Sequence, residues 1–311
     1  MGNPEVPIPY TPTNSPIEEW VEYNGANFKT VTWKVPSDKK YKGKIIYVHG
    51  FAENSKVYTE YFDNISLLGY EVFFFDQRGA GETSPGKLIG ETNEKFVFDD
   101  LDFFIKRNLD ARTNENEKFF LMGHSMGGGI VLNYGIRGKY LKNFKGIVAC
   151  GPLIELHPKT KPNFLLRWAL PQAAKFIPNF KFDSGLNYDF ITSNERWKQY
   201  IMKHDQKLIG TFGQYDDMFK RGFELLKPEY VAKFDKDISV LIVHGTTDFI
   251  NDSKGSEKFF NLLPNDVDKQ FELIKEGRHS LFNENDELFK IVLKYVVDFL
   301  DLKVKEETTS A

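Results

Sequence analysis

Three residues of this chain, a serine, an aspartate and a histidine, have the types and the order that nucleophilic catalysis requires. Ser125 lies in the sequence GHSMG, after the apolar run FFLM and before a segment with helical character. A serine hydroxyl is a weak nucleophile at neutral pH, so it needs an adjacent base that an acidic residue orients. When Gly-x-Ser-x-Gly joins a strand to a helix, the acid and then the base follow the serine along the chain. Asp248, after the apolar run ISVLIVHG, and His279, in KEGRHSLF, fit this order.

The alternatives for each member of this triad are weaker. A glycine-rich turn with an incidental serine would need neither a strand before it nor a helix after it, and the sequence indicates both. Asp252 also follows the strand-like run, but it lies farther from the end of that run than Asp248. His279 is the only one of the six histidines beyond Asp248. The sequence therefore predicts Ser125 as the nucleophile, Asp248 as the acid and His279 as the base.

Hydrolysis by a serine also requires hydrogen-bond donors for the oxyanion of the tetrahedral intermediate. One donor in this architecture is the backbone N–H of the residue after the nucleophile, here Met126, and the other comes from the loop after an earlier strand. The segment YVHGFAEN is that loop, and Gly50 permits its turn. We expect the amide of Phe51 to point into the site and His49 to shape the loop rather than react.

The elements that must position these residues follow from alternating apolar and helical segments. Near-continuous apolar runs such as KIIYVHG, EVFFFDQ and FKGIVACG are typical of strands that are covered on both faces, as in a parallel sheet. Helical patterns occupy the intervals, at roughly 55–68, 94–108, 126–139, 254–263 and 286–301. This alternation predicts an α/β fold with a mostly parallel central sheet flanked by helices. The segments EEWVEYN and FKTVTWKVP could add antiparallel strands at the start.

The order of the segments also divides the chain. Residues 1–17 form a proline-rich arm that we expect to be irregular. The α/β core is expected at 18–151 and 237–303. Between its two parts, residues 152–236 contain clustered prolines and no strand-like run, which predicts an inserted cap of helices and loops. Residues 304–311 are polar and predict a frayed tail.

Bulk composition excludes several classes of protein and indicates a compartment. A net charge of −3 does not favour nucleic-acid binding. The single cysteine, Cys150, excludes an intramolecular disulfide and a multi-cysteine metal site, and it favours a reducing compartment. The first residues lack the basic and then apolar order of a secretory signal, and no apolar run has the length of a membrane span. We therefore expect a cytoplasmic protein that is not secreted.

No cofactor and no metal is implied by the motifs. RGAGETS contains Gly79 and Gly81 after a strand, but Ser84 stands where a dinucleotide-binding loop has its third glycine. We interpret this segment as a tight loop that Asp76 or Arg78 stabilises.

Cys150 follows GIVA at the end of a predicted strand. We interpret it as a small core residue. The second possibility is that Cys150 lines the pocket and makes the protein sensitive to thiol reagents.

Taken together, the HGF loop, FDQRGAG, GHSMGGG, HGTTD and GRHSLF make the chain resemble the monoacylglycerol lipases of the α/β-hydrolase superfamily, especially their fungal members. The similarity spans roughly residues 18–303. It implies the α/β-hydrolase fold with an inserted helical cap, and it carries the catalytic and oxyanion roles onto the residues named above. It also implies that Glu53 helps to bind the glycerol head group. The animal members place an arginine shortly after that glutamate, whereas this chain offers only Lys56 nearby.

The resemblance implies a serine hydrolase that cleaves monoacylglycerol to a free fatty acid and glycerol through an acyl-enzyme intermediate. A lysophospholipase or a broad-specificity carboxylesterase would use the same triad, because these enzymes differ in the shape of the cap pocket. A non-catalytic lipid-binding protein on the same fold is a more distant alternative, which the complete triad disfavours. An aspartate-nucleophile dehalogenase or epoxide hydrolase is disfavoured because the motif holds Ser125.

Part of the cap, residues 156–182, combines basic and apolar side chains. It contains five Lys or Arg, no Asp or Glu, and many apolar residues, among them Phe164, Leu165 and Trp168. This combination is typical of segments that bind a lipid surface. It predicts peripheral contact with a membrane or a lipid droplet through those three residues. The alternative is a cap helix that packs on the body with its cations in solvent.

Overall fold

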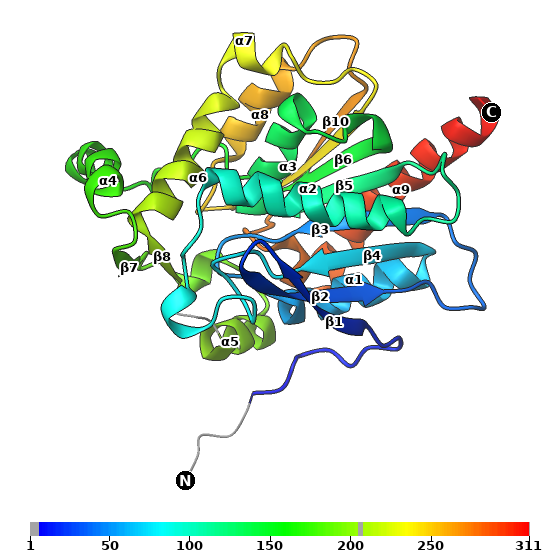
Figure 1. Cartoon of the computed structure of the whole chain (residues 1–311), viewed down its shortest axis with the longest axis horizontal. Coiled ribbons are helices and arrows are strands. Elements are labelled where there is room, and N and C mark those ends of the chain that lie inside the picture. Colours follow the sequence, from blue (N-terminus) through cyan, green and yellow to red (C-terminus); the bar gives the residue numbers. More distant parts are fainter. Residues whose placement is uncertain (1–5, 205–207, 311) are drawn as a thin grey trace.

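A mostly parallel sheet of eight strands forms the centre of the computed structural model, which describes residues 6–204 and 208–310 (Figure 1). The strand order is β1-β2-β4-β3-β5-β6-β9-β10, in which β1 and β2, and β2 and β4, pair antiparallel. All other neighbours pair parallel. The strands are β1 (Ile17–Tyr23), β2 (Ala26–Trp33), β3 (Gly43–Val48), β4 (Tyr70–Phe75), β5 (Phe119–His124), β6 (Phe144–Cys150), β9 (Ser239–Gly245) and β10 (Lys269–Ile274).

Helices cover both faces of this sheet, which explains why the inner strands β3, β4, β5, β6 and β9 are buried along most of their length. Ile46 of β3 belongs to a buried cluster with Phe104 of α2, whereas its neighbour Ile45 belongs to another cluster with Phe62 of α1. The core helices are α1 (Thr59–Leu67), α2 (Glu94–Asp110), α3 (Met126–Arg137), α8 (Ser253–Leu262) and α9 (Asp286–Ser310). Short 3-10 helices in the described chain are η1 (Ser55–Tyr58), η2 (Gly86–Leu88), η3 (Leu141–Asn143), η4 (Tyr188–Phe190) and η5 (Leu281–Asn283).

The α/β fold and the antiparallel strands at the start are therefore confirmed. Because β3, β5, β6, β9 and β10 run parallel, their carboxyl ends meet at one edge of the sheet. The loops that follow these strands carry the predicted site residues. The fold thus brings together residues that are far apart in the sequence, as open α/β sheets do at this edge.

The cap lies between β6 and β9 and contains α4 (Phe164–Phe176), α5 (Glu195–His204), α6 (Phe212–Glu224) and α7 (Pro228–Val231). The expectation that it holds no strand is wrong. The strands β7 (Lys181–Asp183) and β8 (Ile209–Thr211) pair antiparallel beside α6 (Figure 1). Each has three residues, too few to give a recognisable pattern of alternating side chains.

The expected frayed tail at 304–311 is also corrected, because α9 continues to Ser310. The polar sequence KVKEETTSA suggested fraying, but the first residues of this segment pack on the core. Val304 contacts the buried cluster on that face of the sheet. Lys303 is itself buried and forms ion pairs with Asp268 and Glu306. Residue 311 lies outside the described residues.

The arm is irregular from residue 6 to 16, as predicted, and residues 1–5 of the predicted arm lie outside the described range. Its predicted end is one residue too late, because Ile17 already pairs with β2. The buried carboxylate of Asp63 in α1 holds the arm to the core: it accepts hydrogen bonds from the Tyr10 hydroxyl and from the backbone N–H groups of Thr13 and Asn14. Among the described residues, none of the helices combines the length and the apolar character that crossing a membrane would require.

Candidate active site

Ser125 occupies a sharp turn between β5 and α3. Its backbone has φ 52° and ψ −117°, which is a strained conformation for a residue with a side chain. The turn is tight enough that a Cβ on Gly127 would lie 2.1 Å from the carbonyl oxygen of Val48. A Cβ on Gly123 would lie 2.4 Å from the carbonyl oxygen of Gly127. The glycines of the motif are therefore required by the close approach of the backbone, and the predicted strand–turn–helix arrangement is confirmed.

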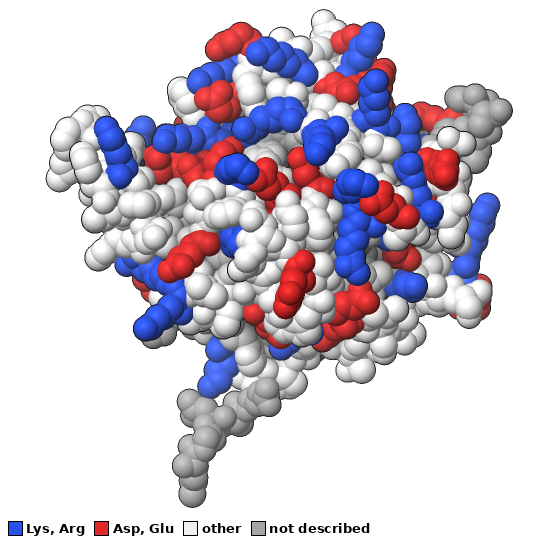
Figure 2. Space-filling model, in the orientation of Figure 1, with Lys and Arg blue, Asp and Glu red and all other residues white. Residues whose placement is uncertain are grey.

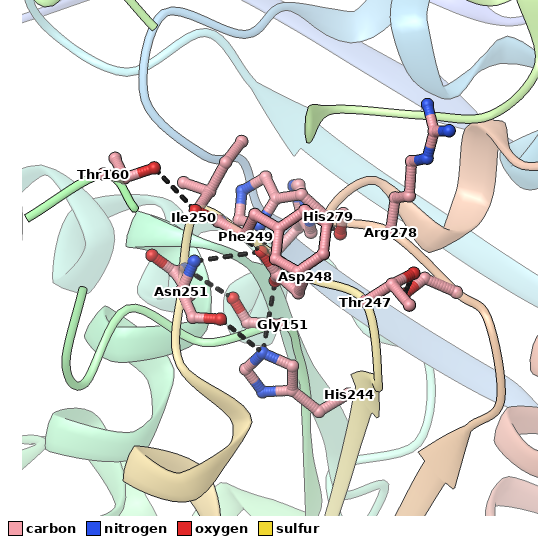
Figure 3. A network of polar contacts seen from close by, with 12 residues as sticks. Gly151, Thr160, His244, Thr247, Asp248, Phe249, Ile250, Asn251, Arg278 and His279 are labelled. Carbon is pink, nitrogen blue, oxygen red and sulfur yellow. Dashed lines mark hydrogen bonds and ion pairs between the residues drawn. The ribbon is translucent and has the colours of Figure 1, made fainter. Parts of the chain in front are cut away.

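Asp248 and His279 meet at the carboxyl ends of β9 and β10 (Figure 3). Oδ2 of Asp248 lies 2.8 Å from Nδ1 of His279. The other carboxylate oxygen, Oδ1, accepts hydrogen bonds from the backbone N–H groups of Ile250 and Asn251 at 2.8 and 2.9 Å. Since Nδ1 faces a carboxylate, it carries a hydrogen, and Nε2 of His279 is left as the basic atom. His279 and Ser125 line the same cavity.

The charge of Asp248 suits this role. Burial alone would raise the pKa of its carboxyl group, but the adjacent His279 imidazole and the hydrogen bonds from His244 and His279 hold that pKa well below its usual range. Asp248 is therefore ionised at neutral pH. A buried carboxylate in this position fixes the tautomer of His279 and stabilises the imidazolium that forms when His279 takes a proton.

Asp252, the alternative acid, has a different function. Its side chain accepts a hydrogen bond from the backbone N–H of Lys254 and caps the start of α8.

The oxyanion loop is held from behind by His49. Burial lowers the pKa of His49 to about 4, so its imidazole is neutral at physiological pH. Nε2 accepts a hydrogen bond from the backbone N–H of Gln77 at 2.8 Å, so Nδ1 carries the hydrogen and donates to the carbonyl of Gly50 at 2.7 Å. His49 is therefore structural, as expected from the sequence.

Phe51 and Met126 are the residues predicted to donate to the oxyanion. Phe51 lines the cavity that contains Ser125. Met126 is the first residue of α3, where the backbone N–H has no acceptor within the helix. Their role as donors stays a prediction, because the position of the oxyanion depends on bound substrate.

Glu53 lines the same cavity and also supports the site from within. One carboxylate oxygen accepts from the backbone N–H of Gly50 and from the Tyr58 hydroxyl. The other lies 2.9 Å from Nδ1 of His124, whose Nε2 donates to the carbonyl of His279 at 3.1 Å. Glu53 thus connects the oxyanion loop, the residue before the nucleophile and the histidine loop. Its contact with a glycerol head group stays a prediction.

Electrostatics hold this network together. Burial alone would raise the pKa of Glu53, but the charge and hydrogen bond of His124 lower it to about 2. Burial opposes the charged form of His124, yet the Glu53 carboxylate raises the pKa of its imidazole overall. Sequence reasoning assigned no role to His124, although its place inside GHSMG, next to the nucleophile, was a signal that could have found it.

The cap contacts the histidine loop directly, which sequence reasoning also missed. The backbone N–H groups of His279 and Ser280 donate to the carbonyls of Phe190 and Ile191 in the cap. Arg278 donates to two further cap carbonyls, those of Asp189 and Thr192. The cap segment 189–194 is thus fastened to the residues on either side of the catalytic base.

Glu284 completes this connection. It is buried, and its carboxylate accepts hydrogen bonds from the backbone N–H of Arg278 and from the backbone N–H and hydroxyl of Ser193.

The cavity above Ser125 has a volume of about 720 Å³. Such a volume is typical of sites that enclose a small organic ligand. The core and the cap both contribute apolar side chains to most of its wall, and Ser125, His279 and Glu53 are among the polar residues that line it. The apolar lining includes Leu153, Ile154, Leu166, Leu170, Met218 and Phe219.

Cys150 does not line this cavity. It is fully buried within the cluster between the sheet and the helices α1 and α9, on the face away from the cap. Burial raises the pKa of its thiol above the usual range. The possibility that Cys150 makes the site sensitive to thiol reagents is therefore corrected in favour of the core residue.

The RGAGETS segment forms the expected tight loop. Asp76 accepts a hydrogen bond from the backbone N–H of Glu82 at 2.7 Å, and Arg78 pairs with Asp100 at 2.9 Å. Both residues that we expected to stabilise the loop do so.

A serine at a strand–helix elbow, an aspartate and a histidine in this chain order, and an eight-stranded sheet with an inserted cap define a serine hydrolase of the α/β-hydrolase class. Residues 39–286 match the protein family described as Serine aminopeptidase, S33.

The chain is 40% identical to the monoglyceride lipase of Saccharomyces cerevisiae over 98% of its length and 99% of that protein. It is 36% identical to a putative monoglyceride lipase of Schizosaccharomyces pombe, over 83% of this chain and 67% of that one. A crystal structure of a soluble variant of the Saccharomyces cerevisiae monoglyceride lipase, in complex with a substrate analogue, matches with a TM-score of 0.90 over 96% of this chain and 99% of the other. This chain therefore belongs to the monoglyceride lipase family.

Proposed function

We propose that this protein hydrolyses monoacylglycerols to a free fatty acid and glycerol. The observation that carries the proposal is the position of Ser125 and His279 in the wall of an apolar cavity that the cap closes over the sheet edge. A single acyl chain fits the apolar lining, and the polar groups near Ser125 suit the ester and the glycerol end. Two relatives whose names give this activity, at 40% and 36% identity, support the same substrate.

The reaction follows from the geometry of the triad. Oγ of Ser125 forms a bond to the ester carbonyl carbon while Nε2 of His279 takes the hydroxyl proton. The backbone N–H groups of Phe51 and Met126 stabilise the oxyanion. The intermediate collapses by breaking its bond to the glycerol oxygen, which receives the proton from His279, and an acyl-enzyme remains. Water then adds to the acyl carbon as His279 takes one of its protons, and the fatty acid leaves as Ser125 regains a proton.

Glu53 is the residue that we propose for recognition of the glycerol hydroxyl groups. Its carboxylate lines the cavity, and the three protein donors that it binds leave acceptor capacity, since a carboxylate accepts about four hydrogen bonds.

Two measurements test this function. A fluorophosphonate probe should label the wild-type protein covalently and should not label Ser125→Ala. Hydrolysis of monooleoylglycerol should release glycerol and oleate in equal amounts. Labelling without release of glycerol would favour a lysophospholipase or a general carboxylesterase. A folded protein that takes no label and cleaves neither monooleoylglycerol nor the substrates of those two enzymes would instead be a lipid-binding protein on the same fold.

We further infer that α4 attaches the protein to a lipid surface. The structure leaves Phe164 80%, Leu165 70% and Trp168 66% exposed, so the helix does not bury these side chains against the body. This exposure favours a lipid surface over the alternative, a cap helix that packs on the body with its cations in solvent. Figure 1 shows α4 at the far end of the cap, and the surface there is largely free of acidic side chains (Figure 2).

The opposite side of α4 faces the cavity. Leu166 and Leu170 line the cavity wall, so one helix contacts both the substrate site and the outside. A helix that exposes apolar side chains and carries the cations Arg167 and Lys175 but no acidic residue suits insertion into the boundary between lipid head groups and acyl chains. Substrate dissolved in the lipid would then lie next to the cavity.

Vesicle binding tests this attachment. Replacing Leu165 and Trp168 with serine should reduce co-sedimentation with vesicles of phosphatidylcholine and phosphatidylserine, and it should leave hydrolysis of a soluble short ester unchanged. Serine at Trp20 and Leu273, which are 51% and 52% exposed on the core, is the matched control and should leave vesicle binding intact. Equal binding by the wild type and the α4 variant would overturn the proposal.

We also propose a cytoplasmic location with peripheral attachment to membranes or lipid droplets. The free, fully buried thiol of Cys150 is compatible with a reducing compartment. Fractionation of cells that express the chain tests the location, since the protein should move from the lipid-bound to the soluble fraction when Leu165 and Trp168 are replaced.

A further inference from the structure

A second imidazole contacts the acid of the triad. His244, near the end of β9, is fully buried, and its Nε2 lies 3.1 Å from Oδ2 of Asp248. Oδ2 is the same oxygen that accepts from Nδ1 of His279 at 2.8 Å (Figure 3). Asp248 therefore lies between two histidines, and the triad mechanism uses only one of them.

The partners of His244 assign its tautomer. Nε2 faces only acceptors, Oδ2 of Asp248 and the carbonyl oxygen of Asn251 at 3.3 Å, so it carries a hydrogen. Nδ1 lies 2.8 Å from the hydroxyl of Ser256, which is also fully buried, in α8. In a neutral imidazole with its hydrogen on Nε2, Nδ1 is an acceptor, and the hydroxyl of Ser256 donates to it. Ser256 thus favours the tautomer that presents a donor to Asp248.

We propose that His244, backed by Ser256, is a positioning residue of this active site: its Nε2–H holds the Asp248 carboxylate and reduces the negative charge that this carboxylate presents to His279. The contacts form a chain of donors from Ser256 through His244 to Asp248 and on to His279. The inference rests on the proposed serine hydrolysis, but it does not depend on the lipid nature of the substrate.

The other elements around the triad contact His279 rather than the Asp248 carboxylate. From β5, His124 donates to the carbonyl of His279, and Glu53 lies behind it. From the cap, the backbone carbonyl of Phe190 accepts from the N–H of His279, and the guanidinium of Arg278 is directed to other cap carbonyls.

The carboxylate itself receives only neutral donors besides the two imidazoles. Its Oδ1 accepts from the backbone N–H groups of Ile250 and Asn251. Among the described residues, His244 is thus the side chain that shares Oδ2 with the catalytic base.

Loss of this donor has a predictable direction. A carboxylate without the His244 hydrogen bond presents more negative charge to His279 and favours its imidazolium form. The pKa that limits the acidic side of the kcat/KM profile should then rise, because His279 must be neutral to accept the proton of Ser125. The carboxylate also becomes freer to rotate, so kcat should fall, while KM should change little because neither His244 nor Asp248 lines the cavity.

Four variants separate this role from simple packing. His244→Leu removes the donor, and His244→Gln keeps an amide N–H at a similar reach. Ser256→Ala removes only the group that sets the tautomer. Ser66→Ala is the matched control, because Ser66 is another fully buried helical serine, hydrogen-bonded to the carbonyl of Asp63 in α1. Hydrolysis of p-nitrophenyl butyrate from pH 5 to 9 and thermal unfolding are measured for all four.

We expect His244→Leu to lower kcat about tenfold with KM within about twofold, the scale of one lost hydrogen bond to a charged group. Its acidic limb should move up by about half a pH unit or more. Ser256→Ala should move the limb in the same direction by less, and His244→Gln should restore most of kcat. Ser66→Ala should lose thermal stability without moving the profile.

Each outcome decides the inference. If His244→Leu and Ser256→Ala only lower the unfolding temperature and leave the pH profile in place, His244 is a packing residue and the inference is wrong. If His244→Leu fails to fold, Ser256→Ala and His244→Gln carry the same test. A wild-type protein that cleaves neither p-nitrophenyl butyrate nor monooleoylglycerol would overturn the proposed function itself, which is a different result from an active enzyme with an unmoved profile.

Discussion

The loops around the triad bury polar groups, whereas the outer helix of the cap exposes apolar ones. Around the triad, the Asp248 carboxylate is buried and accepts from two histidines and two backbone N–H groups. In α4, by contrast, Phe164 and Trp168 stand mostly in solvent. The first arrangement fixes reacting atoms in one geometry, and the second leaves apolar surface free to meet another apolar phase.

The comparison also divides the cap into two parts. The inner segment 189–194 is fastened to the histidine loop by Arg278 and Glu284, whereas α4 has one buried residue, Leu170, and a large exposed surface. The inner part makes the hydrogen bonds to the residues that carry the base. The lesson is that an inserted cap need not behave as one unit: its inner edge belongs to the catalytic apparatus and its outer helix to the surface.

The first prediction, which has the largest expected effect, tests whether catalysis and lipid binding are separate by removing the nucleophile. Ser125→Ala should lower kcat by roughly 10⁴-fold or more, because every later step needs the acyl-enzyme. It should leave vesicle binding unchanged, since α4 is not altered. Steady-state hydrolysis measures kcat, and co-sedimentation measures vesicle binding. Loss of vesicle binding together with activity would contradict the separation of the two regions.

The second prediction concerns Glu53, whose carboxylate connects the oxyanion loop to His124. Glu53→Gln should lower the free energy of unfolding at neutral pH by about 3 kcal/mol, since it leaves the buried imidazole of His124 without its charged partner. Urea unfolding measures this loss, and we also expect lower kcat on any ester.

The contribution of Glu53 to the free energy of unfolding should depend on pH. The pKa of Glu53 is lowered in the folded protein from 4.5 to about 2. Its contribution to stability is therefore complete above pH 4.5 and is lost as the pH falls toward 2. The wild type should lose stability more steeply than Glu53→Gln over this range. Parallel curves for the two proteins would show that the carboxylate is not held by the network.

The third and smallest prediction sharpens the division within the cap. Glu284→Ala should lower kcat about tenfold for soluble and lipid substrates alike, because it leaves the N–H groups of Arg278 and Ser193 without their acceptor and loosens the histidine loop. Replacing Leu165 and Trp168 of α4, which do not line the cavity, should affect only the lipid substrate. Kinetics with p-nitrophenyl butyrate and with vesicle-borne monooleoylglycerol separate the two. If Glu284→Ala affected only the lipid substrate, the inner segment 189–194 would act in lipid binding, as α4 does, and the division of the cap would be wrong.

Much of the core could be predicted from the sequence, because its signals are local. The inner strands of the sheet are nearly continuous apolar runs, and the glycines around Ser125 mark a turn that the chain makes within a few residues. Chain order then leaves one histidine for the base. The meeting of Asp248 and His279 needed no knowledge of side-chain contacts, since parallel strands bring their carboxyl ends to one edge.

What could not be predicted depends on contacts between distant segments. The carboxylate of Glu53 meets His124, 71 positions later in the chain, and Glu284 meets Ser193 across the border of the cap. The strands β7 and β8 are too short to show a period, and α9 is fastened near its end by the ion pair between Lys303 and Asp268, which joins segments far apart in the sequence. The exposure of α4 is likewise a tertiary property, because its composition fits a packed helix as well as a free one.

The most direct test is the release of glycerol and oleate from monooleoylglycerol, compared with lysophosphatidylcholine, dioleoylglycerol, trioleoylglycerol and a short soluble ester. We predict that kcat/KM is highest for monooleoylglycerol and that activity disappears in Ser125→Ala. A protein that cleaves lysophosphatidylcholine or the short ester but not monooleoylglycerol would keep the triad and contradict the substrate that we propose for it.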